Sequence, residues 1–106
     1  MRVLFDQGTP APLRHLLSEH EVETAYERGW SSLQNGDLIA AAEAVGFDVF
    51  VTTDRNLKYQ QNLADRRMAV VVLLTTSWPR IKAASALVVV AVNESFLGAY
   101  VEVSIP

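Results

Sequence analysis

Three aspartates stand where apolar segments of the chain begin or end. Asp6 follows the apolar run at residues 2–5, Asp54 follows the valine- and threonine-rich run at residues 48–53, and Asp37 opens an alanine-rich segment. Converging carboxylates raise one another's pKa, and a hard divalent cation such as Mg²⁺ or Mn²⁺ removes that cost. The chemistry expected of such a group is phosphodiester hydrolysis, in which the metal activates water and neutralises phosphate charge.

Each aspartate also has a simpler explanation when it is taken alone. Asp6 and Asp54 could begin turns, and Asp37 could be an acid favoured by the dipole at a helix N-terminus. The placement of all three at element ends favours a shared metal site.

The elements that must position these acids alternate between strand and helix. Apolar runs without polar alternation indicate strands covered on both faces, and strands separated by helix-length segments indicate βαβ units. The predicted fold is a three-layer α/β/α sandwich with a mainly parallel sheet, and its carboxyl edge is where ligands bind. Strands are predicted at residues 2–5, 21–25, 48–53, 68–74 and 98–105, and helical segments after Pro10 and at 26–30, 37–46, 56–65 and 77–92.

Residues 83–92 are apolar on every side if they are helical. Such a helix is buried in its own core or covered by a partner, so a homodimer is one hypothesis. The valine run at 88–90 leaves a strand open as an alternative.

Composition limits the remaining possibilities. The 106 residues are half hydrophobic, which predicts one domain over residues 1–106. Cysteine is absent, so disulfides and thiolate chemistry are excluded and a cytoplasmic location is expected. No apolar stretch is long enough for a membrane span. The net charge of −3 confines any contact with nucleic acid to a local patch.

Three stretches carry a family resemblance. The sequences VLFDQGTPAPL, NGDLIAAAEAVGFDVFVTTDRNL and YQQNLADRRMAVVVL resemble small PIN-like proteins of the DUF5615 type, which are related to VapC toxin ribonucleases. The resemblance implies a PIN-like fold and an Mg²⁺- or Mn²⁺-dependent ribonuclease with an antitoxin partner. It assigns Asp6, Asp37 and Asp54 to the metal-binding acids, and Thr52 to the threonine of the family's T-x-D strand end.

Two positions depart from the pattern of that family. A further acid on an intervening helix has only Glu23 and Glu27 as candidates, of which Glu27 is the better. Asn56 stands where active relatives often have an acid, and its carbonyl oxygen can ligate without bringing charge. A PIN-like module that binds a protein or RNA partner without cleaving RNA is therefore the alternative function.

Other residues near Asp54 are candidates for RNA contact. Arg55 and Lys58 supply positive charge, and Tyr59 supplies a ring on which a base can stack, although Tyr59 could equally pack on the sheet. A phosphoacceptor receiver domain is a third interpretation of strand-end acids. It is disfavoured because Phe5, not an acid, precedes Asp6, and because Lys82 falls in a predicted helix.

Overall fold

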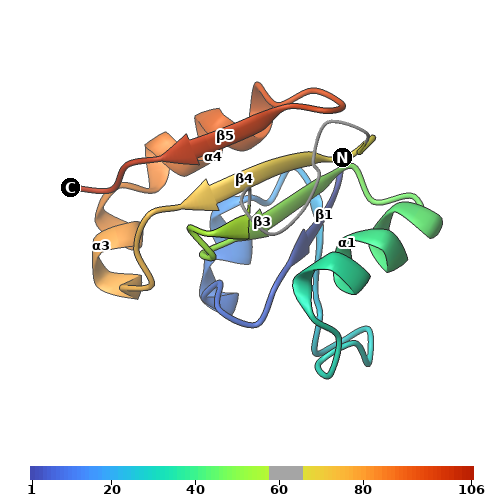
Figure 1. The fold of residues 1–106 in the computed structure, drawn as a ribbon. Coiled ribbons are helices and arrows are strands. Elements are labelled where there is room, and N and C mark those ends of the chain that lie inside the picture. Colours follow the sequence, from blue (N-terminus) through green and yellow to red (C-terminus); the bar gives the residue numbers. More distant parts are fainter. Residues whose placement is uncertain (58–65) are drawn as a thin grey trace.

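A single sheet of five parallel strands forms the centre of the protein (Figure 1). The computed structural model describes residues 1–57 and 66–106. Every strand pairing is parallel, as the sequence predicts for the sheet. The strands are β1 (Arg2–Phe5), β2 (Glu21–Thr24), β3 (Val49–Thr52), β4 (Ala69–Leu73) and β5 (Tyr100–Val103), in the order β2-β1-β3-β4-β5.

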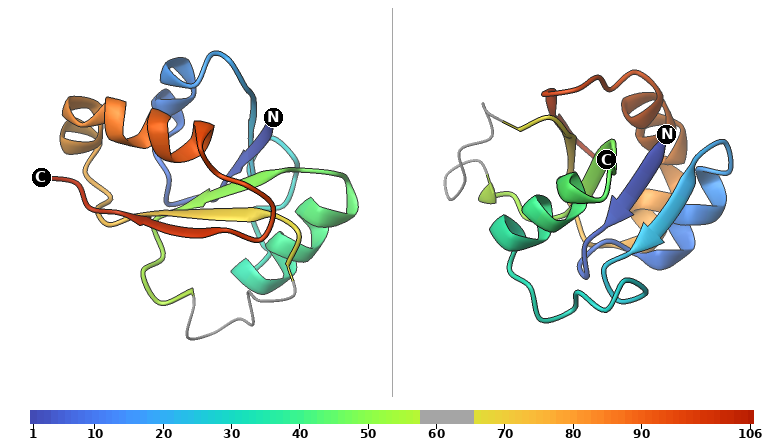
Figure 2. Two further views of the ribbon diagram at one scale, coloured as in Figure 1. Left: turned by 90° about the horizontal axis from the view of Figure 1, so that it is seen from above. Right: turned by 90° about the vertical axis from the view of Figure 1, so that its right-hand side faces the viewer.

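Helical segments cover both faces of this sheet (Figure 2). One face carries the 3₁₀ helix η1 (Ala11–Leu16) together with α3 (Trp78–Ala83) and α4 (Ser85–Asn93), and the other carries α1 (Asn35–Ala44). The protein is therefore a three-layer α/β/α fold, in agreement with the alternation of predicted strands and helices.

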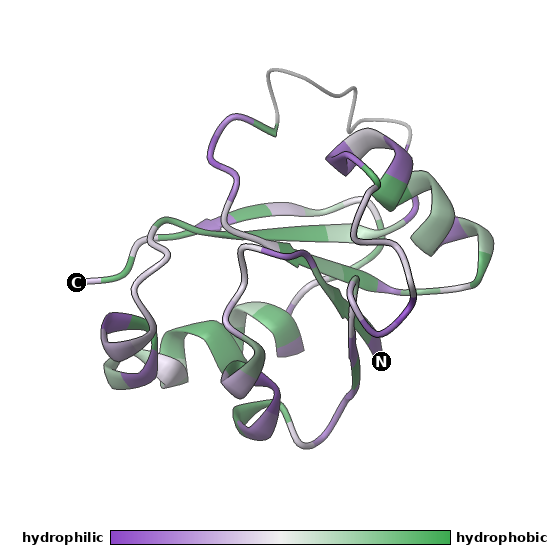
Figure 3. Ribbon diagram, turned by 90° about the horizontal axis from the view of Figure 1, so that it is seen from below, coloured by the Kyte–Doolittle hydropathy of each residue, from purple (hydrophilic) through white to green (hydrophobic). Residues whose placement is uncertain are grey.

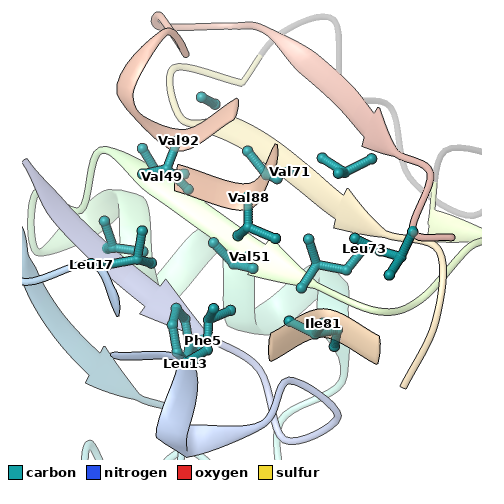
Figure 4. Close-up of a cluster of buried hydrophobic side chains, with 14 residues drawn as sticks. Phe5, Leu13, Leu17, Val49, Val51, Val71, Leu73, Ile81, Val88 and Val92 are labelled. Atoms are coloured by element: carbon teal, nitrogen blue, oxygen red, sulfur yellow. The ribbon is translucent and has the colours of Figure 1, made fainter. Parts of the chain in front are cut away.

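Alternating side chains of each central strand enter two separate cores. In β1, Val3 and Phe5 pack under η1, α3 and α4, whereas Leu4 packs against α1. Val51 of β3 enters the first core, which Figure 4 shows in close-up, and Phe50 enters the second. Because both faces are covered, the central strands are hydrophobic along their length (Figure 3), which explains why they were readable as uninterrupted apolar runs.

Local sequence signals explain several helix ends. Gly46, with φ of 87°, ends α1 at the glycine expected there. Ser77 caps α3 by accepting a hydrogen bond from the backbone N–H of Arg80 at 3.4 Å, and Pro79 lies in the first turn. The helix expected after Pro10 is a 3₁₀ helix that buries Leu13.

The predicted continuous helix at residues 77–92 is wrong in one respect. Ala84, with φ −106° and ψ 23°, separates α3 from α4. The alternative of a strand at 88–90 is also wrong, because the valine run is helical. The predicted helix at 56–65 falls largely outside the described residues.

The helix α4 is buried on one side only. Val88 and Val92 are fully buried in the core, while Leu87 and Val90 are 48% and 50% exposed. The expectation that residues 83–92 are buried on more than one side therefore does not hold within the single chain. Among the described residues, no helix is long and apolar enough to cross a bilayer.

The strand order creates a switch point between β1 and β3. After β1 the chain moves outward to β2, and after β2 it returns across β1, by way of α1, to β3. In open parallel sheets the crevice at such a reversal, beyond the carboxyl ends of the strands, is the usual place for a ligand. Asp6 and Asp54 follow these two strands directly or within two residues.

Candidate functional site

One buried hydroxyl group links the ends of β1 and β3. Thr52, the last residue of β3, is completely buried, and its hydroxyl donates a hydrogen bond to Oδ2 of Asp6. The hydroxyl oxygen of Thr52 also accepts a hydrogen bond from the backbone N–H of Asp54 at 3.0 Å. The backbone N–H of Asp6 in turn donates to the carbonyl of Val51 at 3.1 Å. The parallel pairing of β1 and β3 thus joins residues that lie 46 positions apart in the sequence.

Asp6 is a buried carboxyl group, with 8% of the residue exposed. Its Oδ1 accepts from the backbone N–H of Thr9 at 3.0 Å and from the Thr9 hydroxyl at 2.7 Å. Burial raises the pKa of Asp6, and hydrogen bonds from Thr52 and Thr9 oppose that rise by stabilising the carboxylate. Asp6 is therefore held in one orientation by neutral donors, and residues 1–57 and 66–106 contribute no cation to the groups that bond to it.

Asp54 is half-buried and is held by two donors. Asn35 Nδ2 donates to Oδ2 of Asp54 at 2.9 Å, and the backbone N–H of Asn56 donates to Oδ1 at 3.0 Å. Since Asn35 is the first residue of α1, this bond fixes the N-terminus of the helix at the same edge of the sheet. Asn56 is exposed, and it contacts Asp54 through its backbone N–H.

Asp37 lines a hollow to which neither Asp6 nor Asp54 contributes. It is exposed in the first turn of α1 and lines a cavity of about 320 Å³ that also includes Gln34 and Arg66. Within residues 1–57 and 66–106, no three acidic, histidine or cysteine side chains are grouped so that they could hold a metal ion. The structure thus connects Asp6 with Asp54, and places Asp37 in a separate hollow.

The acids that follow or belong to β2 are engaged elsewhere. Glu27 pairs with Arg14 at 2.8 Å and accepts from the backbone N–H of Thr24 at 2.9 Å. The hydrogen bond from Arg14 lowers the pKa of Glu27. Glu23 pairs with Arg2 and Arg28 at 3.6 and 3.5 Å. Neither glutamate is hydrogen-bonded to Asp6 or Asp54, and the accessory role of Glu27 stays a prediction.

The predicted RNA contacts are only partly described. Arg55 is exposed in the loop directly after Asp54. Lys58 and Tyr59 lie outside the described residues. Lys82 is exposed in α3, not at the end of a strand, which removes the lysine that a receiver domain needs.

A cavity of about 490 Å³ opens beside Asp6. The side-chain amide of Gln7 donates to the carbonyl of Ser31 across this cavity, and Tyr26 stands at its wall with 80% of the residue exposed. Gly8 is required in the loop because a Cβ there would lie 2.5 Å from the Thr53 hydroxyl oxygen. The cavity is lined by Asp6, Gln7, Gly8, Thr9, Pro10, Ala11, Thr24, Tyr26 and Ser31.

The chain matches no protein-family model, no curated protein and no solved structure. The function of the site must therefore be inferred from its own residues. Three of them, Thr9, Asn35 and Tyr26, were not predicted from the sequence as parts of the site. Thr9 follows Asp6 at a spacing typical of a side-chain-capped turn, which is a signal that could have found it. Asn35 could have been noticed as a polar residue opening a helix, whereas nothing local marks Tyr26.

Proposed function

We propose that the protein is a divalent-metal-dependent ribonuclease that uses Asp6 and Asp54. The observation that carries this proposal is the Thr52 hydroxyl, which bonds both to the carboxylate of Asp6 and to the backbone N–H of Asp54 at the switch point of the sheet. Acids that follow neighbouring parallel strands at such a crevice are suited to a hard cation and a phosphate.

The donor set fits Mg²⁺ or Mn²⁺. Each carboxylate oxygen can accept about two hydrogen bonds. Among the described residues, Oδ2 of Asp6 accepts one bond, from Thr52, and the two oxygens of Asp54 accept one each from Asn35 and Asn56. These three oxygens retain capacity for a ligand, and such ions commonly bind one or two carboxylates together with water and phosphate oxygens. A cation would also offset the burial that raises the pKa of Asp6.

Within this proposal each residue has a distinct task. Asp6 and Asp54 would hold the ion, which supplies activation of water and neutralisation of charge on the phosphate. Thr52 and Thr9 fix the direction of the Asp6 carboxyl group, and Asn35 fixes that of Asp54. Asp37, which is exposed in the first turn of α1, is proposed to contact metal-bound water. Arg55, which is exposed directly after Asp54, is proposed to contact the RNA backbone.

A specific observation favours the second candidate, a PIN-like module that binds a partner without cleaving RNA. In the described part of the chain, Asp6 and Asp54 have no third acid grouped with them, and Glu27 is committed to Arg14. A site with two carboxylates has less charge with which to stabilise a phosphoryl transition state.

Metal binding and RNA cleavage separate the two candidates. Calorimetric titration with Mn²⁺ should show binding by the wild type and a loss of at least tenfold in affinity for Asp6→Asn or Asp54→Asn. Loss of a residue that only supports a metal ligand already lowers metal affinity by about tenfold or more, so loss of a ligand itself should lower it at least as much. The same variants should abolish Mn²⁺-dependent cleavage of RNA. The matched control is Glu94→Gln, at an exposed acid that directly follows α4. Cleavage that survives both aspartate variants would refute the ribonuclease, and Mn²⁺ binding without cleavage would favour the partner-binding module.

An antitoxin that blocks this activity is part of the same proposal. An RNA substrate places the activity in the cytoplasm. Expression of the wild type should then slow growth of a bacterial host, and expression of Asp54→Asn should not. Equal growth with both would count against a toxin role.

A further inference from the structure

We propose that the cavity beside Asp6 receives a nucleobase of a single-stranded RNA, which stacks on the ring of Tyr26. This inference rests on the proposed function, because it names the form of the substrate and one residue that selects it. The size of the cavity, about 490 Å³, is in the range of pockets that hold small organic ligands.

Tyr26 is exposed although its backbone is fixed. With 80% of the residue exposed, the side chain belongs to neither hydrophobic core. On one side, the Ala25 N–H donates to the carbonyl of Phe5 at 2.8 Å. On the other, the Gly29 N–H donates to the carbonyl of Tyr26 at 3.0 Å. The backbone at Tyr26 is anchored and its ring is left uncovered, so a base that stacks on the ring has to order only this one side chain, which has two rotatable bonds.

The strand register brings this ring to the acidic site. β1 and β2 are parallel, and Phe5 pairs with Thr24, so Asp6 and Tyr26 follow the same end of neighbouring strands. Both residues line the one cavity. A nucleotide with its phosphate at Asp6 and Asp54 can therefore direct its base toward Tyr26.

The groups around the ring favour a base over a phosphate. The described cations nearest in sequence are already engaged, since Arg14 pairs with Glu27, and Arg28 lies 4.8 Å from the centre of the Trp30 ring and pairs with Glu23. The cavity is lined instead by the polar residues Gln7, Thr24 and Ser31, whose side chains are of the kind that bonds to the edge of a base. The side-chain nitrogen of Gln7 also donates to the Ser31 carbonyl. A base within a duplex is already stacked and cannot reach Tyr26, so a single strand is the matching substrate.

Binding of a labelled oligouridine of about ten nucleotides, a length that covers typical single-strand sites, tests this inference. Fluorescence anisotropy is measured with Ca²⁺ in place of Mg²⁺, so that cleavage does not interfere. Tyr26→Ala should weaken binding about five- to hundredfold, the range for one base stacked on one ring, while Tyr26→Phe should stay within about twofold of the wild type. An abasic oligomer of equal length and charge should bind the wild type and Tyr26→Ala equally.

Three results would overturn the inference. These are wild-type binding too weak to measure, an equal affinity for wild type and Tyr26→Ala, or a loss in Tyr26→Ala that is as large on the abasic oligomer. The metal site is tested separately by Asp54→Asn. Unchanged cleavage in Asp54→Asn together with base-dependent loss in Tyr26→Ala would refute the metal-dependent ribonuclease and support the base site. Abolished cleavage in Asp54→Asn with no effect of Tyr26→Ala would do the reverse.

Discussion

Replacement of Thr52 by valine removes the hydroxyl that joins the two strand ends. Valine has nearly the same shape and favours strands equally, so the substitution isolates two hydrogen bonds. The bond donated to the Asp6 carboxylate is worth about 1.5–3 kcal/mol, and the bond accepted from the backbone of Asp54 about 1 kcal/mol. We expect Thr52→Val to lower the free energy of unfolding by about 2.5–4 kcal/mol at neutral pH. At roughly 4 °C per kcal/mol, the Tm should fall by about 10–16 °C.

The loss in Thr52→Val should depend on pH. Burial raises the pKa of Asp6 in the folded state above the ordinary value of 3.8, so folding favours the protonated carboxyl group. The stability gained from this preference is fully present below pH 3.8 and is lost as pH rises through the folded-state pKa. The Thr52 hydroxyl opposes this rise, and its removal should raise the pKa of Asp6 further. The difference in stability between wild type and variant should therefore be small in acid and grow as pH increases.

Urea unfolding followed by circular dichroism, across a series of pH values and with EDTA present, measures both effects. Thr52→Ser keeps the hydroxyl and is the control, with an expected cost of about 1 kcal/mol for one buried methyl group. If Thr52→Val and Thr52→Ser were equally stable, or if their difference did not change with pH, the role assigned to the hydroxyl would be wrong.

Three further predictions follow from other contacts. Asp6→Asn, measured without metal, should gain stability relative to wild type as pH rises, because a neutral amide avoids the cost of burying a charge; a constant difference in urea unfolding across pH would contradict this. Gly8→Ala should cost about 1–3 kcal/mol through the clash with Thr53, and Thr53→Ala should recover at least about 0.5 kcal/mol of it in a double-mutant cycle; simple additivity would exclude the clash. A homodimer formed through the half-exposed Leu87 and Val90 of α4 should be seen by light scattering at micromolar concentration and should be lost in Leu87→Glu. A monomeric mass for the wild type would refute the homodimer.

The sheet could be predicted from sequence because its central strands are covered on both faces. Nearly continuous burial leaves only apolar residues in β1, β3 and β4 apart from Arg2, at the start of β1, and Thr52, and such runs are visible without any structure. The break at Ala84 was not visible, because neither glycine nor proline marks it. The helical valines of α4 show tertiary packing overriding strand preference, since Val88 and Val92 fill the core between α4 and the sheet.

The candidate site was predictable in position more than in detail. Strand ends locate Asp6 and Asp54, because parallel strands bring their carboxyl ends to one edge. The direction in which an acid of the first helical turn faces cannot be predicted from the sequence pattern alone. Asp37 was therefore expected beside Asp6 and Asp54, whereas it lines a different hollow. The bonds from Thr9 and Asn35 depend on loop geometry and on the docking of α1, so they emerge only once the chain is folded.

The pairing of β1 with β3 also governs when the site can exist. Partners 46 residues apart must close a long loop. Such contacts form slowly because the chain loses the entropy of loop closure before the contacts that stabilise the loop are made. During synthesis, Asp6 emerges before Thr52 and has no hydroxyl to bond until β3 has left the ribosome. The nascent chain therefore carries no assembled site before that point, and the site appears together with the closure of the sheet.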